Sequence, residues 1–381
     1  MATFVWACFD GGGNVPPSIG IGRELVRRGH DVRFAGRPEM APRVQSAGMR
    51  AHVLPSSYRH ADQFGWHPRG RLFSYLTSPA VGQDVLDLRR DLRADVLVVD
   101  AMFGAALDVT PDSDVPTAVM LHTFLHRTVD GWEVLMGGQA EARERSGLGT
   151  MPDLRTLWGR PDVLHVNSLA ELDSAPSSPW PTAGHGAPVL EPDARARVVR
   201  TDRRDDRPLV LVSFSTAVAQ SSVGKLQSTL DALADLPVRG VATIGAVDPD
   251  RLRVPASVLA VPFADHGELL RDADLVVTHG GHGTAMRALS HGVPLVCLTG
   301  RAADQEGVAA LDQPRVAAFV EERGAGLSLP ADAPVGQVRD AIRRVLADRA
   351  YRDAAEVVAV PLRATDGATL AADRLEGLLA A

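Results

Sequence analysis

Cysteine is scarce in this sequence. Its 381 residues include two cysteines, Cys8 and Cys297, so a disulfide framework is excluded. Each lies in an apolar run, which is typical of buried thiols in a reducing cytosol. The sequence also lacks an apolar run of the roughly 18 residues that a membrane-spanning helix needs. Neither a disulfide-stabilised protein nor a membrane-spanning one is indicated.

A surplus of positive charge is absent too. Lysine and arginine number 40 against 47 acidic residues, for a net charge of −7, which argues against nucleic acid as a partner. Residues 1–8 carry no basic leader and run directly into Asp10 and three glycines, so a signal peptide is not indicated. We expect a soluble, cytoplasmic protein with neither a nucleic-acid nor a membrane partner.

What is present is a globular composition with a repeating pattern. Apolar residues make up 45% and charged residues 23%, and at roughly 100–200 residues per domain the length favours two domains. Short apolar runs alternate with amphipathic stretches in the first half, which indicates βαβ units and a parallel sheet. The predicted strands there are 3–8, 31–35, 95–100 and 117–121, and the predicted helices are 18–28 and 41–47.

The pattern loosens over 56–90 and again over 123–159, where aromatic residues mix with histidine and glycine. Irregular insertions at the carboxyl edge of a parallel sheet are usual ligand sites, but helices that pack over the sheet explain the same residues equally well. The polar stretch 192–208 has no hydrophobic period and is predicted to be a linker.

After the linker the alternation resumes, so the fold class is α/β, with two doubly wound parallel sheets in domains predicted at 1–200 and 208–363. A cleft between the domains is the expected ligand site. The predicted strands are 209–214, 238–244, 258–261, 274–278 and 294–298, and the predicted helices are 223–236, 267–271, 284–290, 335–348 and 368–379, with another starting over 304–311.

The turn between strand 274–278 and the following helix carries most of the chemical information. Backbone N–H groups of Gly281, His282, Gly283 and Thr284 would point from a helix N-terminus, with the macrodipole favouring an anion. The Thr284 hydroxyl and a ring N–H of His279 would add donors. A diphosphate fits such a site without Mg²⁺, because fixed dipoles replace the cation. The alternative is that the glycines only allow close packing of strand and helix.

Other polar residues follow neighbouring strands of the same domain. Ser213, Ser215 and Thr216 end its first strand, where hydroxyls would reach the same diphosphate. Asp304 and Gln305 come after strand 294–298, and a carboxylate beside an amide suits the recognition of sugar hydroxyls. The same pair also suits a helix N-cap and its neighbour.

The segment THGGHGTAMRALSHGVPLVCLTGRAADQ (278–305) resembles the donor-binding signature of bacterial natural-product glycosyltransferases of family 1, the antibiotic and macrolide type with the GT-B fold. The resemblance covers nearly the whole chain. The first helix and second strand (19–36), two strands of the acceptor half (94–109 and 115–123) and the nucleotide-base segment (261–277) are similar to the same family.

This resemblance implies an inverting transfer from a nucleotide-diphosphate sugar to an apolar secondary-metabolite acceptor, with no cofactor and no metal. A dTDP-deoxysugar is favoured over a UDP-sugar as the donor. The final helix, about 364–381, would pack back on the N-terminal domain, and a homodimer is left open. The implied roles are the diphosphate for His279 and 281–284 with Ser215 and Thr216 assisting, the sugar for Asp304 and Gln305, and the base for Val261, Pro262 and Phe263.

Two departures from the family pattern stand out. Asn14 occupies the place of the histidine that takes the acceptor proton in many relatives, while Asp100 matches that histidine's aspartate partner. An amide has no useful basicity, so Asn14 can orient an acceptor but cannot deprotonate it. The base is then another residue, the acceptor is reactive enough to need none, or activity is lost. The candidate bases are Asp10, Asp100, His67 and His122.

The second departure is the run 299–303, which differs from the usual shorter, proline-containing segment and leaves the register of Asp304 open. Among the remaining histidines, His52, His126, His165 and His185 share no ligand spacing, so no zinc motif is predicted. A nucleotide-sugar epimerase of the same two-domain plan and an auxiliary protein for a partner enzyme are the alternative functions.

Overall fold

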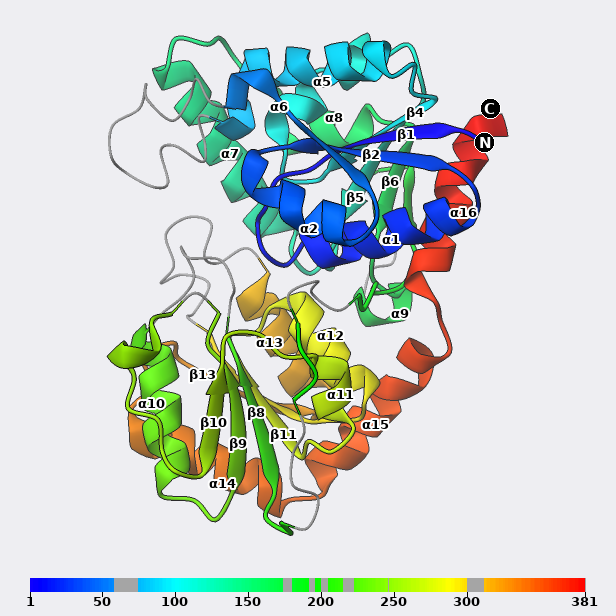
Figure 1. Ribbon diagram of the computed structural model, residues 1–381. Coiled ribbons are helices and arrows are strands. Elements are labelled where there is room, and N and C mark those ends of the chain that lie inside the picture. The colour runs from blue at the N-terminus through cyan, green and yellow to red at the C-terminus, as the bar shows by residue number, and fades with distance from the viewer. Residues whose placement is uncertain are drawn as a thin grey trace. The chain divides into compact units, whose positions relative to one another are not determined.

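The computed structural model describes residues 1–57, 75–173, 180–191, 196–199, 205–214, 223–245, 247–299 and 312–380. Two compact units are present (Figure 1). Unit 1 comprises Met1–Glu191 together with Asp366–Ala381, and unit 2 comprises Pro192–Thr365. The chain therefore leaves the first unit, builds the second and then returns to the first.

Unit 1 is built on a parallel sheet in the order β3-β2-β1-β4-β5-β6-β7. Every residue of β4 and β5 is buried, as expected of central parallel strands that are covered on both faces. The strands are β1 (Thr3–Ala7), β2 (Asp31–Gly36), β3 (Arg50–Val53), β4 (Val96–Asp100), β5 (Thr117–Leu121), β6 (Val163–Val166) and β7 (Ala183–His185).

One face of this sheet is covered by α1 (Val15–Arg27), α2 (Ala41–Ser46) and the C-terminal α16 (Gly367–Gly377) (Figure 1). Ala371 and Leu375 of α16 are fully buried in the same core as the strands. The guanidinium of Arg28, directly after α1, contacts carboxylates of α16, which adds an electrostatic contact to the apolar packing. The remaining helices of unit 1 are α5 (Pro79–Asp91), α6 (Gly104–Asp108), α7 (Val129–Arg145), α8 (Leu154–Gly159) and α9 (Ala170–Asp173).

Unit 2 repeats the plan with a parallel sheet in the order β10-β9-β8-β11-β12-β13. Its strands are β8 (Leu209–Ser213), β9 (Arg239–Thr243), β10 (Val258–Val261), β11 (Leu275–Thr278), β12 (Leu295–Leu298) and β13 (Gly326–Leu329). The helices are α10 (Val223–Ala234), α11 (His266–Leu270), α12 (His282–Ser290), α13 (Gln313–Glu322), α14 (Val335–Ala347) and α15 (Ala350–Arg363).

Helix α14 illustrates why these elements pack as they do. Its buried residues Val338, Ala341, Ile342 and Val345 recur at helical spacing and share a core with α10 and the strands. Short 3₁₀ turns complete the two units at Pro38–Met40, Pro55–Ser57, Thr110–Asp112, Pro249–Arg251 and Leu378–Ala380. Within the described ranges, none of the helices has the length and apolar character needed to cross a bilayer.

The two loosened stretches of sequence resolve in favour of helices wherever they are described. Residues 79–91, 129–145 and 154–159 form α5, α7 and α8, with Trp132 and Trp158 buried. The interpretation as irregular insertions is wrong for these segments. Helix α12 begins at His282, two residues before the predicted start, because Gly281 already serves as its N-cap.

Candidate functional site

In each sheet, the order in which the chain adds strands reverses between two neighbouring strands. In unit 1 the chain builds outward from β1 through β2 on one side and from β4 on the other, and in unit 2 it does so from β8 and β11. Ligands of open α/β sheets bind outside the carboxyl ends of strands at such a switch point. Asn14 follows β1 and Asp100 ends β4, while Ser213 ends β8 and His279 follows β11. The structure therefore brings these sequence-predicted residues to the two switch points.

The turn from β11 into α12 depends on two glycines. Gly280 has a φ of +86°, and a Cβ there would lie 2.8 Å from the carbonyl oxygen of Gln313. A Cβ on Gly281 would lie 2.7 Å from Nε2 of the His279 ring. Neither position accepts a side chain without rearrangement, so the glycines fix both the turn and the placement of the histidine.

The His279 ring is buried between this turn and the end of β8. Burial is the main cause that lowers its pKa to about 4, the positive Lys225 contributes, and a hydrogen bond with the Ser213 backbone opposes the shift. The ring is thus neutral near pH 7. A neutral imidazole carries one N–H donor and one acceptor, so His279 offers hydrogen bonding rather than positive charge.

The first turn of α12 contains backbone N–H groups that come before the hydrogen-bond ladder of the helix. The first intrahelical bond in this turn is from the Ala285 N–H to the Gly281 carbonyl, 3.0 Å long, so the N–H groups of His282, Gly283 and Thr284 precede the ladder. Neither an acidic residue nor a side-chain cap occupies this turn. Gly283 is exposed, and a Cβ there would meet open space. A helix N-terminus in this state binds anions through its N–H groups and its dipole.

The residues predicted to border a nucleotide base lie at the carboxyl end of β10. Ile244 and Gly245 donate backbone hydrogen bonds to Val261 and Pro262, 2.9 Å each, so pairing with β9 continues past the end of the strand. Pro262 is exposed, and Val261 and Phe263 are half-buried. Ser215, Thr216, Asp304, Gln305 and His67 lie outside the described residues.

In unit 1, Asn14 is held tightly by its neighbours. Its Nδ2 donates to Asp100 Oδ2 and to the Phe9 carbonyl, both at 2.8 Å. Its Oδ1 accepts from the Gly11 N–H at 3.0 Å. The side chain is 5% exposed. Through these hydrogen bonds the Asn14 amide joins the loop after β1 to the end of β4.

Asp100 is a buried carboxylate that, within the described ranges, forms no ion pair with a lysine or an arginine. Besides Asn14, it accepts a 2.9 Å hydrogen bond at Oδ1 from the Met102 N–H. Burial raises its pKa to about 6, although the bonds from Asn14 and Met102 act in the opposite direction. Each oxygen keeps a lone-pair direction beyond these bonds. A carboxylate with a pKa near neutrality is suited to general-base chemistry.

His122 joins the same cluster through two residues that sequence reasoning missed. Its Nε2 lies 3.0 Å from Ser18 Oγ, which donates to the Asn14 carbonyl at 2.8 Å. Its Nδ1 lies 2.8 Å from Nδ2 of Asn167. The Ser18 hydroxyl donates its proton to the Asn14 carbonyl, so Ser18 Oγ can only accept a hydrogen bond from the His122 ring. The ring proton is therefore on Nε2, and Nδ1 accepts from the Asn167 amide. The lone pair of His122 is then engaged, and its Nε2 stands 3.9 Å from Asp100.

Asp10 has a different environment. Both of its oxygens lie 2.9 Å from Nη1 of Arg43, and Oδ1 also accepts from the Gly12 N–H at 3.0 Å. The Arg43 side chain is buried. These contacts hold the glycine loop after β1, so the carboxylate is engaged in a structural role. Arg43 itself gave no signal in the sequence, since it resembles any arginine of a helix.

Comparison with known proteins gives three kinds of match. Residues 227–377 match the family model "Erythromycin biosynthesis protein CIII-like, C-terminal domain". The chain is 28% identical to 4'-demethylrebeccamycin synthase of Lentzea aerocolonigenes over 98% of both chains. Its fold is similar to that of CalG4, the calicheamicin glycosyltransferase, with a TM-score of 0.76, 22% identity and coverage of 100% and 98%. The glycosyltransferase VinC in complex with dTDP matches with a TM-score of 0.74, 20% identity and 99% coverage of both chains.

The family match covers the turn and helix of the candidate anion site, and the full-length relative extends the likeness across both units. The structural matches carry the same two-sheet architecture. On these grounds the chain is a glycosyltransferase with the GT-B fold, similar to those of antibiotic biosynthesis.

Proposed function

We propose that this glycosyltransferase moves a deoxysugar from a dTDP-sugar to an apolar secondary metabolite, with inversion at the anomeric carbon. The observation that carries the donor half is the N-terminus of α12, where three backbone N–H groups precede the helical ladder at the switch point of unit 2. The preference for dTDP is supported by VinC, whose structure contains that nucleotide.

In this proposal the diphosphate lies against Gly281–Thr284, and the single ring N–H of the neutral His279 turns to it from the Ser213 backbone. Ser215 and Thr216 assist, Asp304 and Gln305 bind the sugar, and Val261, Pro262 and Phe263 border the base. The donors favour the leaving group over the intact donor, because negative charge builds up on the departing diphosphate oxygen.

On the acceptor side we assign the general base to Asp100. The acceptor O–H or N–H gives its proton to the carboxylate, the freed pair forms the bond to the anomeric carbon, and the bond to the diphosphate breaks on the opposite face. The raised pKa of Asp100 supports this role, and Asn14 positions the carboxylate through its 2.8 Å hydrogen bond. Asp10 and His122 are less suited, since Arg43 and Asn167 engage them.

The donor assignment is tested by Gly283→Asp. The new carboxylate would enter open space at the second residue of α12, where a negative charge is compatible with the helix but competes with the diphosphate. Since hydrogen bonds to a charged group contribute about 1.5–3 kcal/mol each, we expect dTDP binding to weaken about 10–100-fold in calorimetry.

Gly336→Asp is the matched control. It adds the same charge at the second residue of α14, where a Cβ would meet only Arg339 Nη2 at 3.8 Å. Its dTDP affinity should equal that of the unaltered protein. Equal affinities in all three proteins would place the diphosphate elsewhere and defeat the assignment.

A further inference from the structure

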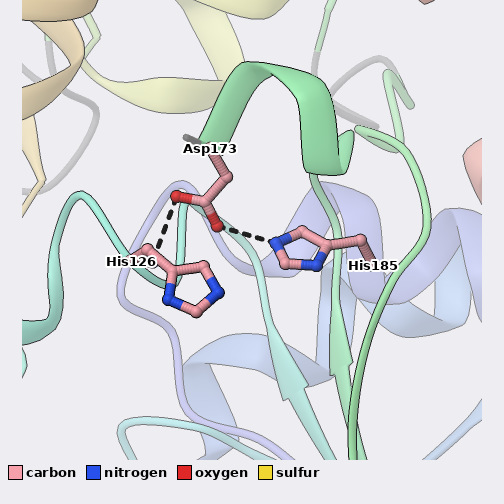
Figure 2. A group of neighbouring side chains, drawn as sticks. All are labelled: His126, Asp173 and His185. Carbon is pink, nitrogen blue, oxygen red and sulfur yellow. Dashed lines mark hydrogen bonds and ion pairs between the residues drawn. The ribbon is translucent and has the colours of Figure 1, made fainter. Parts of the chain in front are cut away.

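Three side chains from separate segments of unit 1 converge away from the residues discussed so far. They are His126 in the loop after β5, Asp173 at the end of α9 and His185 at the end of β7 (Figure 2). One ligand atom from each lies within 4.8 Å of the other two. Among the described residues this is the group of histidine, cysteine and acidic side chains that meets that criterion.

Asp173 is fully buried, and the backbone around it holds its carboxylate in place. Oδ2 accepts from the Leu125 N–H at 2.7 Å, and Oδ1 accepts from the N–H groups of His126 and Arg127 at 3.0 and 3.1 Å. Three backbone donors hold both carboxylate oxygens in place. The group therefore offers an oxygen pair with a fixed orientation, whether or not anything binds to it.

The two imidazoles lie beside this carboxylate. His185 Nε2 is 2.8 Å from Asp173 Oδ2, and the rings of His126 and His185 stack with their centroids 5.6 Å apart at 22° (Figure 2). Both rings are half-buried, so they remain accessible to a small solute. Two imidazoles and one fixed carboxylate are a donor set that zinc and related transition metals prefer over Mg²⁺ or Ca²⁺.

We propose that His126, Asp173 and His185 bind a divalent transition metal, with Zn²⁺ as the best match. With bond lengths of about 2.0–2.2 Å, ligand atoms around a tetrahedral zinc stand about 3.3 Å apart. To reach that spacing, His185 Nε2 and Asp173 Oδ2 move about 0.5 Å apart from their 2.8 Å contact. Two ligand atoms at the upper limit of 4.8 Å would move about 1.5 Å closer together. The proton now between Nε2 and Oδ2 is released, and water completes the coordination.

The backbone donors to Asp173 remain as outer-shell partners that orient the ligand. The metal would tie together the β5 loop, α9 and the last residue of β7. His122 lies four residues before His126 on that loop, so the clamp would also restrain the segment that carries the Ser18–His122–Asn167 network. No step of the sugar transfer runs through this site.

The test uses the full chain without a polyhistidine tag, stripped with EDTA and titrated with Zn²⁺. Bound metal is measured by mass spectrometry after desalting, and Co²⁺ in place of Zn²⁺ gives a visible absorption that reports the ligand geometry. We expect one tightly bound Zn²⁺ per chain, a melting temperature that rises with Zn²⁺, and no displacement by excess Mg²⁺.

His126→Phe removes a ligand and keeps an aromatic ring for the stack on His185. His291→Phe, at the end of α12 in unit 2, is the matched control because His291 is also half-buried. We expect Zn²⁺ affinity to fall at least about tenfold in His126→Phe, as for the loss of metal ligands and their partners, and to stay unchanged in His291→Phe. Substoichiometric binding by the unaltered chain, or equal affinity in both variants, overturns the proposal.

Discussion

The two switch points of this protein present opposite kinds of surface. At the α12 turn in unit 2, backbone N–H groups stand ahead of the helical ladder and no acidic residue lies in the first turn. At the β1–β4 edge in unit 1, by contrast, side chains form hydrogen bonds within the protein: the Asn14 amide donates to Asp100, the Ser18 hydroxyl donates to the Asn14 carbonyl, and the His122 ring contacts Ser18. The first site therefore offers N–H groups that suit an anion, whereas the second holds the Asp100 carboxylate within a hydrogen-bond network of the protein itself.

This difference predicts that changes at the two sites impair different properties of the enzyme. Changes at the α12 turn should affect donor affinity, and changes at the Asp100 network should affect the rate of transfer while donor affinity is kept. A variant that affects both quantities at one edge would break the distinction.

Asp100→Asn is the change with the largest expected effect. It removes the assigned base but keeps the shape of the side chain, so kcat/KM should fall about 10²–10⁴-fold while the dTDP dissociation constant stays unchanged. Asp10→Asn is the control, because Asp10 binds Arg43 and the Gly12 N–H. An equal loss in both variants, or none in Asp100→Asn, would remove Asp100 as the base and favour an acceptor that needs no deprotonation.

The pH dependence of transfer gives the next largest effect. A base must be ionised to accept a proton, so with a pKa of about 6 for Asp100 the rate should fall about tenfold per pH unit below that value. The hydrogen bond from Asn14 lowers this pKa. Asn14→Ala should therefore move the acid limb of the kcat/KM profile to higher pH. A limb that stays in place, or moves to lower pH, would contradict the assignment.

The same raised pKa has a consequence for stability. Folded Asp100 binds its proton more tightly than the unfolded chain does, so the folded state is favoured at acidic pH and loses this contribution as the pH rises through about 4 to 6. In chemical denaturation, Asp100→Asn should flatten that part of the profile relative to the unaltered protein.

The smallest effect is expected at His279. A neutral ring donates one ordinary hydrogen bond, so His279→Gln should weaken dTDP binding about 2–10-fold. Because the pKa of His279 is about 4, this contribution should be constant between about pH 6 and 8. The assignment would be wrong if dTDP affinity fell steeply as the pH rises from about 6 to 8 and this fall were absent in His279→Gln. That result would show a charged imidazolium instead.

Much of the fold followed from the sequence wherever a strand is buried on both faces. DVLVVD and DLVVT contain the fully buried β4 and β11. Sequence reasoning missed four strands. Three of them have weaker patterns, since β3 and β7 are exposed or half-buried along their length and β13 has a single buried residue, but β6 was missed although three of its four residues are buried. Helix α15 contains Pro361 near its end, a residue that argues against a helix interior.

The candidate site divides along the same line. The α12 turn presents backbone groups, and the glycines that shape it lie in one contiguous segment, so the sequence alone predicts it. The cluster around Asp100 joins residues far apart in sequence, and Ser18 and Asn167 have no local pattern that marks them. Asp173 was invisible for the same reason, because its significance lies in backbone donors 46 to 48 residues away.

The return of the chain to unit 1 has a practical implication for engineering. Since α16 fills the core beside α1, the second unit is an internal cassette attached at two points, near 191 and 366. A hybrid enzyme should accordingly exchange 192–365 and retain both flanks of the recipient. A single crossover after the linker would pair a foreign α16 with the native groove and leave Ala371 and Leu375 mismatched against it.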